Sequence, residues 1–353
     1  MKEDFRGGRQ AHAALLVLPT IAVVILAFGL DAAAAAQTTG AYCTATAQML
    51  LRACGFEKQD DYWVMRAKCN NESEAQDRNE CLENASIELR DGNELCAEQF
   101  DSRLGACASL GEGRYDPVLE RGMFLSDPTH ITNLNPYFPI KVGNRWDYAG
   151  GTETNVVEVT NETKLIDDFR CLVVRDLVYD EGVLIEATDD WYAQAKSGDV
   201  WYCGEEVKNF ESFAGDQPQR PELVAIDGRF KADVDLDKAG IIFRAKPVVG
   251  EANLEEFSLG NAEDVAEVLS TSYRYGAEAE LDRFVPRRLA ERMCSAGDCV
   301  VTNNFSMLEP GVFERKYYAR GIGVFLEVNP DSGEKSQLVN CNFSSKCLSL
   351  PRP

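Results

Sequence analysis

The distribution of hydrophobic and polar positions divides the chain into three stretches. An almost continuous apolar run covers Ala13–Leu30. A proline-free stretch rich in Ala, Glu, Leu, Gln and Arg covers Thr44–Leu110, and short apolar segments separated by Gly, Asn and Asp follow from Asn135. The second composition favours helices, whereas closely spaced short segments without long helices between them indicate antiparallel strands. We therefore predict an α+β fold, in which a small helical unit precedes a mainly antiparallel β sandwich or barrel-like domain.

Changes in composition place the boundaries between these parts. The apolar run is preceded by cationic residues and followed by Ala34-Ala35-Ala36, which suits a signal-peptide cleavage site. The run exceeds the usual ~7–15 residues of a signal peptide, so an uncleaved membrane anchor is the alternative. Gly, Pro and Asp become frequent after Leu110, which indicates a linker. The predicted parts are a signal peptide at 1–36, a Cys-rich helical unit at 37–110, a linker at 111–134, a β-rich domain at 135–330 and a Cys-bearing tail at 331–353.

Strand-like patterns recur through the β-rich part of the chain. For Asn261–Leu269 a short helix is an alternative to a strand. The candidate strands are Arg145–Tyr148, Val156–Asn161, Phe169–Tyr179, Val183–Asp189, Val224–Phe230, Glu255–Ser258, Glu267–Tyr275, Cys299–Ser306, Phe313–Arg320 and Val324–Val328.

A further stretch, Asp190–Glu206, predicts a hairpin of two aromatic strands around a turn at Lys196–Asp199. If Ala195 pairs with Val200, one face carries Tyr192, Trp201 and Cys203, and the other carries Trp191, Ala193, Val200 and Tyr202. Both faces are aromatic, so we expect the hairpin to be central in its sheet and covered on both sides. The four aromatic rings serve either as core or as a stacking platform for a flat ligand such as a sugar.

All 12 cysteines follow the predicted signal peptide, and an even number in an exported chain indicates disulfides. The first six are spaced by 11, 15, 12, 15 and 11 residues, which reads the same in both directions. An 11-residue step turns a helix by about 1100°, close to three full turns, so cysteines at this spacing share a face. An antiparallel hairpin would then form the nested bridges Cys43–Cys107, Cys54–Cys96 and Cys69–Cys81. Four short helices with bridges between neighbours are the competing arrangement.

The other six cysteines suggest three bridges in the β-rich part. Cys171 and Cys203 lie in predicted strands, while Cys294–Cys299 and Cys341–Cys347 would each close a short loop. The helical unit is either a cap that needs its bridges because its core is small, or a docking module. Trp63 is expected to pack inside it.

Charge and histidine content narrow the function. The chain carries a net charge of −22, which disfavours binding to nucleic acid and to anionic membranes. Contact with a membrane is expected only through the N-terminal segment, if it is uncleaved. Of two histidines, His12 lies in the predicted signal peptide and His130 in a loop-like stretch without a nucleophile motif. Multi-histidine zinc sites are therefore disfavoured, and His130 is expected to be a surface residue.

The best candidates for catalysis are carboxylates at the open end of the predicted hairpin. Asp190, Glu205 and Glu206 lie beside aromatic rings, as a glycoside hydrolase requires. The same oxygens could bind calcium, and so could Asp233–Asp237 by its alternation of Asp residues. An EF-hand loop is disfavoured, because Lys238 occupies the position at which such a loop has its glycine. We expect no cofactor, with calcium as the alternative.

Three motifs resemble those of a family of exported bacterial proteins of uncharacterised function. They are NPYFPIKVGNRWDY from Asn135, the DWYAQ…VWYCGE hairpin, and LEPGVFERKYYARGIGVFLEV from Leu308. The resemblance covers about Asp116–Val328 and implies a compartment and a β-rich fold, but no catalytic residues. Cys203 departs from the family pattern, which is aromatic at that position, and so does the Cys-bearing tail.

Two functions of different class are consistent with these features. The first is a non-catalytic protein, secreted or held in the periplasm or cell envelope, whose β domain binds a small ligand or a protein partner. The second is a secreted carbohydrate-active hydrolase using Asp190 with Glu205 or Glu206. Buried aromatic faces would disfavour the hydrolase, and an open cleft with an exposed Trp would favour it.

Overall fold

The computed structural model describes residues 40–353, so the predicted signal peptide lies outside the described residues. These residues form one compact unit, in which a helical hairpin precedes a large antiparallel sheet. Among residues 40–353, no helix is both long and apolar enough to cross a membrane.

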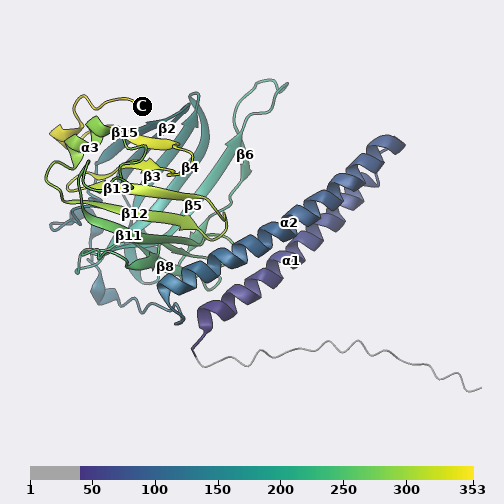
Figure 1. Cartoon of the computed structure of the whole chain (residues 1–353), viewed down its shortest axis with the longest axis horizontal. Coiled ribbons are helices and arrows are strands. Elements are labelled where there is room, and N and C mark those ends of the chain that lie inside the picture. Colours follow the sequence, from purple (N-terminus) through teal and green to yellow (C-terminus); the bar gives the residue numbers. More distant parts are fainter. Residues whose placement is uncertain (1–39) are drawn as a thin grey trace, which may run out of the picture. The chain divides into compact units, whose positions relative to one another are not determined.

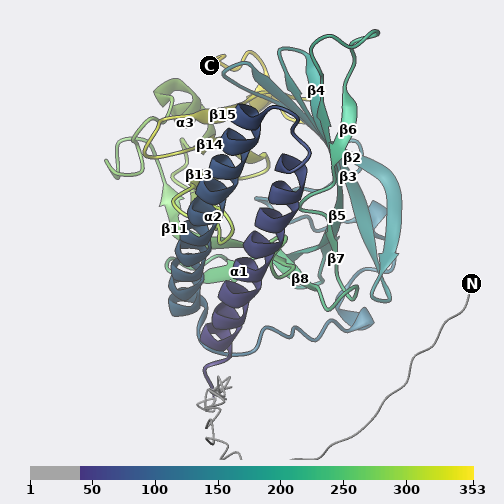
Figure 2. The ribbon, with the colours of Figure 1, turned by 90° about the vertical axis from the view of Figure 1, so that its right-hand side faces the viewer.

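The helical hairpin consists of α1 (Tyr42–Cys69) and α2 (Ala75–Leu110), which run side by side in Figures 1 and 2. Three disulfides join the two helices at Cα–Cα distances of 5.5–5.8 Å. They are Cys43–Cys107, Cys54–Cys96 and Cys69–Cys81, which confirms the nested pairing. Small residues such as Ala47 and Ala85 fill the space between the helices, so cross-links replace a hydrophobic core here.

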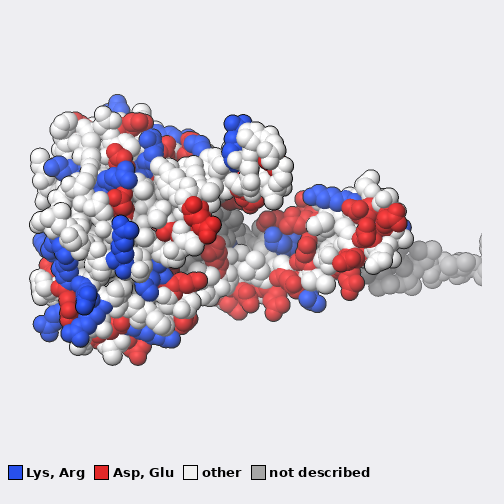
Figure 3. All heavy atoms as spheres, turned by 90° about the horizontal axis from the view of Figure 1, so that it is seen from above, with Lys and Arg blue, Asp and Glu red and all other residues white. Residues whose placement is uncertain are grey.

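The expectation that Trp63 packs inside the hairpin is wrong, because its side chain is 60% exposed. Trp63 follows Cys54 by nine residues, or about two and a half helical turns, which puts it on the face opposite that disulfide. Acidic side chains also gather on the hairpin surface (Figure 3). In α2 alone there are eight carboxylates and three arginines.

The strands form one sheet that nearly closes into a barrel-like structure (Figures 1 and 2). The order is β10-β8-β5-β4-β3-β2-β1-β15-β14-β13-β12-β11-β9, with β6 and β7 pairing beside this path with β5. The strands are β1 (Arg145–Gly150), β2 (Glu153–Ile166), β3 (Phe169–Asp180), β4 (Val183–Gln194), β5 (Val200–Glu211), β6 (Glu222–Ala225), β7 (Phe230–Lys231), β8 (Lys238–Phe243), β9 (Ala252–Leu254), β10 (Glu256–Phe257), β11 (Asp264–Tyr273), β12 (Cys299–Ser306), β13 (Phe313–Ala319), β14 (Gly323–Val328) and β15 (Lys335–Cys341). A short helix, α3 (Arg287–Met293), packs into the larger core, and three-residue 3₁₀ turns η1 (Arg121–Met123), η2 (Pro128–His130) and η3 (Ser345–Cys347) complete the elements.

The sheet nearly closes where β8 passes the link between β9 and β10. These two short strands lie at opposite ends of the strand order, yet only Glu255 separates them in the chain. Gly240 of β8 allows the approach, because a Cβ atom there would lie 2.0 Å from the carbonyl oxygen of Glu255. The absence of a side chain at one position thus lets the two ends of the sheet meet.

The aromatic hairpin forms from β4 and β5, but its register differs from the prediction by one residue. Ala195 N–H donates to the Asp199 carbonyl, so the loop holds three residues rather than four, with Gly198 at a φ of 97°. Tyr192 therefore pairs with Tyr202, and a register shift follows it. One face consequently carries Trp191, Ala193, Trp201 and Cys203, and the other carries Tyr192, Val200 and Tyr202. Both faces are covered, as predicted.

The predicted linker and tail both belong to the packed structure. In the linker, Phe124 is buried and stacks on Phe169 with ring centroids 4.3 Å apart. The tail contributes β15, which lies between β1 and β14. The helix considered for Asn261–Leu269 is wrong, since that segment leads into β11.

The remaining three disulfides are those predicted. Cys171–Cys203 ties β3 to β5 across β4 at a Cα–Cα distance of 6.7 Å. The other two bridges, Cys294–Cys299 and Cys341–Cys347, close short segments. All twelve cysteines are therefore paired.

Candidate functional site

A cavity of about 340 Å³ lies inside the barrel-like sheet. We call it the sheet cavity. One wall comes from β1–β4 and the other mainly from β13 and β14. Its lining residues are Phe138, Pro139, Ile140, Trp146, Tyr148, Asn155, Val157, Val159, Val174, Asp176, Asp190, Tyr192, Ile242, Glu255, Lys316, Tyr318, Gly323, Val324, Glu327 and Ser336.

Two carboxylates, Asp176 and Asp190, stand on the wall built from β3 and β4. Asp190 is directly opposite Val174 in the strand pairing, two positions from Asp176 on β3. Alternation along β3 therefore points Asp176 to the same face as Val174 and Leu172. Asn155 Nδ2 donates to Asp176 Oδ1 at 2.8 Å, and the Tyr202 hydroxyl donates to Asp190 Oδ1.

Burial disfavours ionisation of these two acids. It raises the pKa of Asp190 to about 8, and the neighbouring Glu205 adds to the effect, while the hydrogen bond from Tyr202 opposes it. Burial likewise raises the pKa of Asp176 well above its usual range, with a further contribution from Asp190. Near neutral pH, Asp190 is thus mostly protonated.

The opposite wall carries an ion pair and a third acid, Glu255, which is buried. Lys316 Nζ lies 3.4 Å from Glu327 Oε1, and attraction to Glu327 raises the pKa of Lys316 despite its burial. Glu255 is 5% exposed and accepts a hydrogen bond of 2.7 Å from Asn304 Nδ2. Burial raises the pKa of Glu255 to about 7. Lys316 is the only Lys or Arg among the cavity-lining residues of the described chain.

This arrangement suits a ligand with a cationic group and an apolar body. A positive charge placed beside Asp176, Asp190 and Glu255 would stabilise their ionised forms, so binding would release protons. The rings of Trp146 and Tyr192 and the neighbouring aliphatic side chains offer the apolar surface.

The structure brings two of the three predicted catalytic candidates together, Asp190 and Glu205, and places Glu206 apart from them. Asp190 and Glu205 lie opposite one another on β4 and β5, and burial raises the pKa of Glu205 to about 8. Glu206 points to the other face, where it pairs with Lys208 at 2.7 Å. Only Asp190 of the three lines the sheet cavity.

The predicted stacking platform is not exposed. Trp191 and Trp201 are 4% and 8% exposed and belong to the smaller core on the other face of the sheet. Lys164 Nζ lies over the Trp191 ring, 3.4 Å from its centroid. Tyr202 is buried behind Asp190, so among the four predicted aromatic residues only Tyr192 lines the cavity.

Four charged residues of the cavity were not predicted from the sequence: Asp176, Glu255, Lys316 and Glu327. A signal for Asp176 exists, because it shares a strand face with the apolar residues Leu172, Val174 and Val178. Charged residues in an inward phase are costly to bury and therefore mark a polar interior.

The structure gives less support to the other two sites considered from the sequence, His130 and the Asp233–Asp237 segment. His130 has a side chain that is 84% exposed, with its Nδ1 2.8 Å from Asp127 Oδ2, as expected of a surface residue. Asp233–Asp237 forms a turn in which Asp233 N–H donates to the Asp237 carbonyl. Within residues 40–353 no group of three or more His, Cys, Asp or Glu side chains is placed to hold a metal ion, so calcium gains no support from this geometry.

Comparison of the chain with protein-family models, with curated proteins and with solved structures gives no match.

Proposed function

We propose that this chain is an exported, non-catalytic binding protein whose β domain takes up a small cationic ligand with an apolar body in the sheet cavity. The observation that carries the proposal is the set of carboxyl groups around that cavity, on the buried Asp190 and Glu255 and the half-buried Asp176. Six disulfides support a location outside the reducing cytosol, either secreted or in the periplasm or cell envelope.

The alternative, a carbohydrate-active hydrolase, receives less support from the same residues. Such an enzyme needs one protonated and one ionised carboxyl group, which requires environments that move the two pKa values apart. Burial raises the pKa of both Asp190 and Glu205 to about 8. The two tryptophans of the hairpin, Trp191 and Trp201, are buried on the other face of the sheet and offer no open stacking surface for a sugar.

The proposal is tested with three probes of similar size: 2-phenylethylamine, 2-phenylethanol and phenylacetate. Isothermal titration at about pH 7, in buffers of different ionisation enthalpy, measures affinity and proton release together. We expect the amine to bind best and to release protons. Equal binding of the alcohol, or binding of the amine without proton release, would overturn the proposal.

Two matched substitutions on the hairpin locate the site. Asp190→Asn removes a carboxylate from the cavity wall, and we expect it to weaken amine binding by roughly tenfold. Glu206→Gln alters a carboxylate of the same hairpin on the opposite face and should leave binding unchanged. Equal loss in both variants would place the amine elsewhere on this acidic chain.

A further inference from the structure

A second pocket, of about 640 Å³, lies where the base of the helical hairpin meets the outer face of β8 and β9. We call it the hairpin pocket. Its apolar lining comes from both parts of the chain: Leu50 and Leu110 from the helices, and Ile241, Leu254 and Phe257 from the sheet. The pocket therefore exists only in the assembled unit.

The charge of this pocket is opposite to that of the surrounding molecule. Its lining includes four cationic residues, Arg103, Arg114, Lys238 and Arg244, and two acidic ones, Asp116 and Glu263. The chain as a whole carries a charge of −22, and the hairpin surface is rich in carboxylates (Figure 3). Because the rest of the protein is acidic, a cationic lining makes this pocket a place where an anion is favoured.

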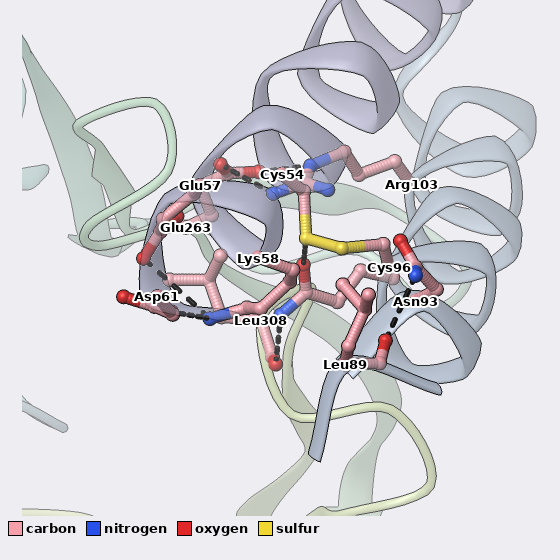
Figure 4. The surroundings of a disulfide bond; sticks show 11 residues. Cys54, Glu57, Lys58, Asp61, Leu89, Asn93, Cys96, Arg103, Glu263 and Leu308 are labelled. Atoms are coloured by element: carbon pink, nitrogen blue, oxygen red, sulfur yellow. Dashed lines mark hydrogen bonds and ion pairs between the residues drawn. A yellow bond between two sulfur atoms is a disulfide. The ribbon is translucent and has the colours of Figure 1, made fainter. Parts of the chain in front are cut away.

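Arg103 is the most deeply buried cation among the residues that line the pocket. Arg103 is 4% exposed, and its Nε and Nη2 donate to Glu263 at 2.7 and 2.9 Å (Figure 4). Its Nη1 is buried and has no hydrogen-bond partner among the described residues. Because a buried donor without an acceptor is costly, this atom favours a ligand that brings an acceptor oxygen.

Among the other three cations of the pocket, only Arg114 has no carboxylate partner within the described residues. Lys238 pairs with Asp116 at 2.8 Å and Arg244 with Glu251 at 2.9 Å. Arg114 instead lies over the Tyr42 ring, 4.0 Å from its centroid, and forms no ion pair with a described carboxylate. Arg114 can therefore meet the charge of an incoming anion without breaking an existing pair.

We propose that the hairpin pocket binds an amphiphilic monocarboxylate of the fatty-acid type. Its carboxylate would accept from Arg103 Nη1 and face Arg114, and its apolar chain would lie against Leu50, Leu254 and Phe257. This site is separate from the sheet cavity and takes ligands of the opposite charge. Failure of one proposal in its test therefore does not affect the other.

The test uses the full chain with its disulfides intact, and decanoate as the probe, with 1-decanol as its uncharged match. Isothermal titration below the micellar concentration measures the dissociation constant. We expect decanoate to bind at least roughly tenfold more tightly than decanol. Absence of decanoate binding, or equal binding of decanol, would overturn the proposal.

Three arginine variants locate the carboxylate. Arg103→Lys keeps a positive charge beside Glu263 but removes the forked donors, so decanoate should bind roughly tenfold more weakly. Arg114→Gln changes an exposed residue and should weaken decanoate binding severalfold. This variant therefore still tests the site if Arg103→Lys fails to fold. Arg90→Gln, on the exposed face of the same helix as Arg103, is the control and should bind normally. Unchanged affinity in Arg114→Gln, or an equal loss in Arg90→Gln, would contradict the assignment.

Discussion

Asp190→Asn is expected to stabilise the protein at alkaline pH and to flatten the dependence of its stability on pH. In the folded chain, burial raises the pKa of Asp190 from 3.8 to about 8. Below about pH 4 the carboxyl is protonated in both folded and unfolded chains and has no effect. Between about pH 4 and 8 the unfolded chain loses this proton and the folded chain keeps it, so the free energy of unfolding falls as pH rises. Above about pH 8 the carboxyl is ionised in the folded chain too, and the full free-energy cost of the buried charge lowers the stability.

The size of the effect follows from the pKa values. A change from 3.8 to about 8 corresponds to an upper limit on the order of 6 kcal/mol. Asparagine has the same shape and keeps an oxygen that accepts from Tyr202, but its amide brings donors that cost roughly 1–3 kcal/mol if they are unpaired. We therefore expect Asp190→Asn to be equal to or less stable than the wild type near pH 5, and more stable by about 2 kcal/mol or more near pH 8.5.

Urea unfolding followed by tryptophan fluorescence, with disulfides intact, measures this difference across pH. Asp189→Asn is the matched control, because Asp189 is the preceding residue on β4, points to the other face and pairs with Arg175 at 3.3 Å. It should keep the slope of the wild type. A wild-type stability that rises between about pH 5 and 8.5, or an Asp190→Asn variant with the wild-type slope, would refute the reasoning.

Four further predictions concern the packing and the disulfides of the fold. Gly240→Val should prevent the sheet from closing, because even a Cβ atom would overlap the Glu255 carbonyl, and a large loss of melting temperature or of soluble protein would show it. Gly55→Ala should instead raise the free energy of unfolding by about 0.5–1 kcal/mol, since a Cβ atom in that helical position meets nothing within 4 Å. Trp63→Phe should remove most of the acrylamide-quenchable fluorescence, because the other three tryptophans are buried. Peptide mapping without reduction should recover Cys69–Cys81, and a Cys54–Cys69 peptide would contradict the nested bridges.

The helical hairpin was predictable because the features that determine it lie close together in the sequence. The spacing of the cysteines and the helical period together determine which side chains can meet, and three disulfides result. The same periodicity, counted from Cys54, places Trp63 on the outside of the hairpin. The general tendency of large aromatic residues to be buried does not hold here, because the two helices are too closely bridged to leave space for an indole ring between them.

The sheet cavity was only partly predictable, because strand pairing amplifies small errors. A turn one residue shorter than expected moved Trp201 and Cys203 to one face and Tyr202 to the other. Strands alternate with a period of two, so a slip of one residue reverses every side chain. Lys316 and Glu255 reach the cavity because strands that are distant in the sequence pair with one another. A local sequence pattern does not predict such pairings.

The wall shared by the two pockets explains why the helical hairpin belongs to the β domain. Ile241 of β8 lines the hairpin pocket and Ile242 lines the sheet cavity, so this strand is covered on one face by the hairpin and on the other by the barrel interior. Arg103 of α2 extends this contact into a buried ion pair with Glu263, and removing one partner of such a pair costs about 3–5 kcal/mol. Without residues 40–110, Glu263 would lose that partner and the outer face of β8 would meet water. The disulfides that stiffen the hairpin therefore also hold in place one wall of the barrel, which favours a structural cap over an independently attached docking module.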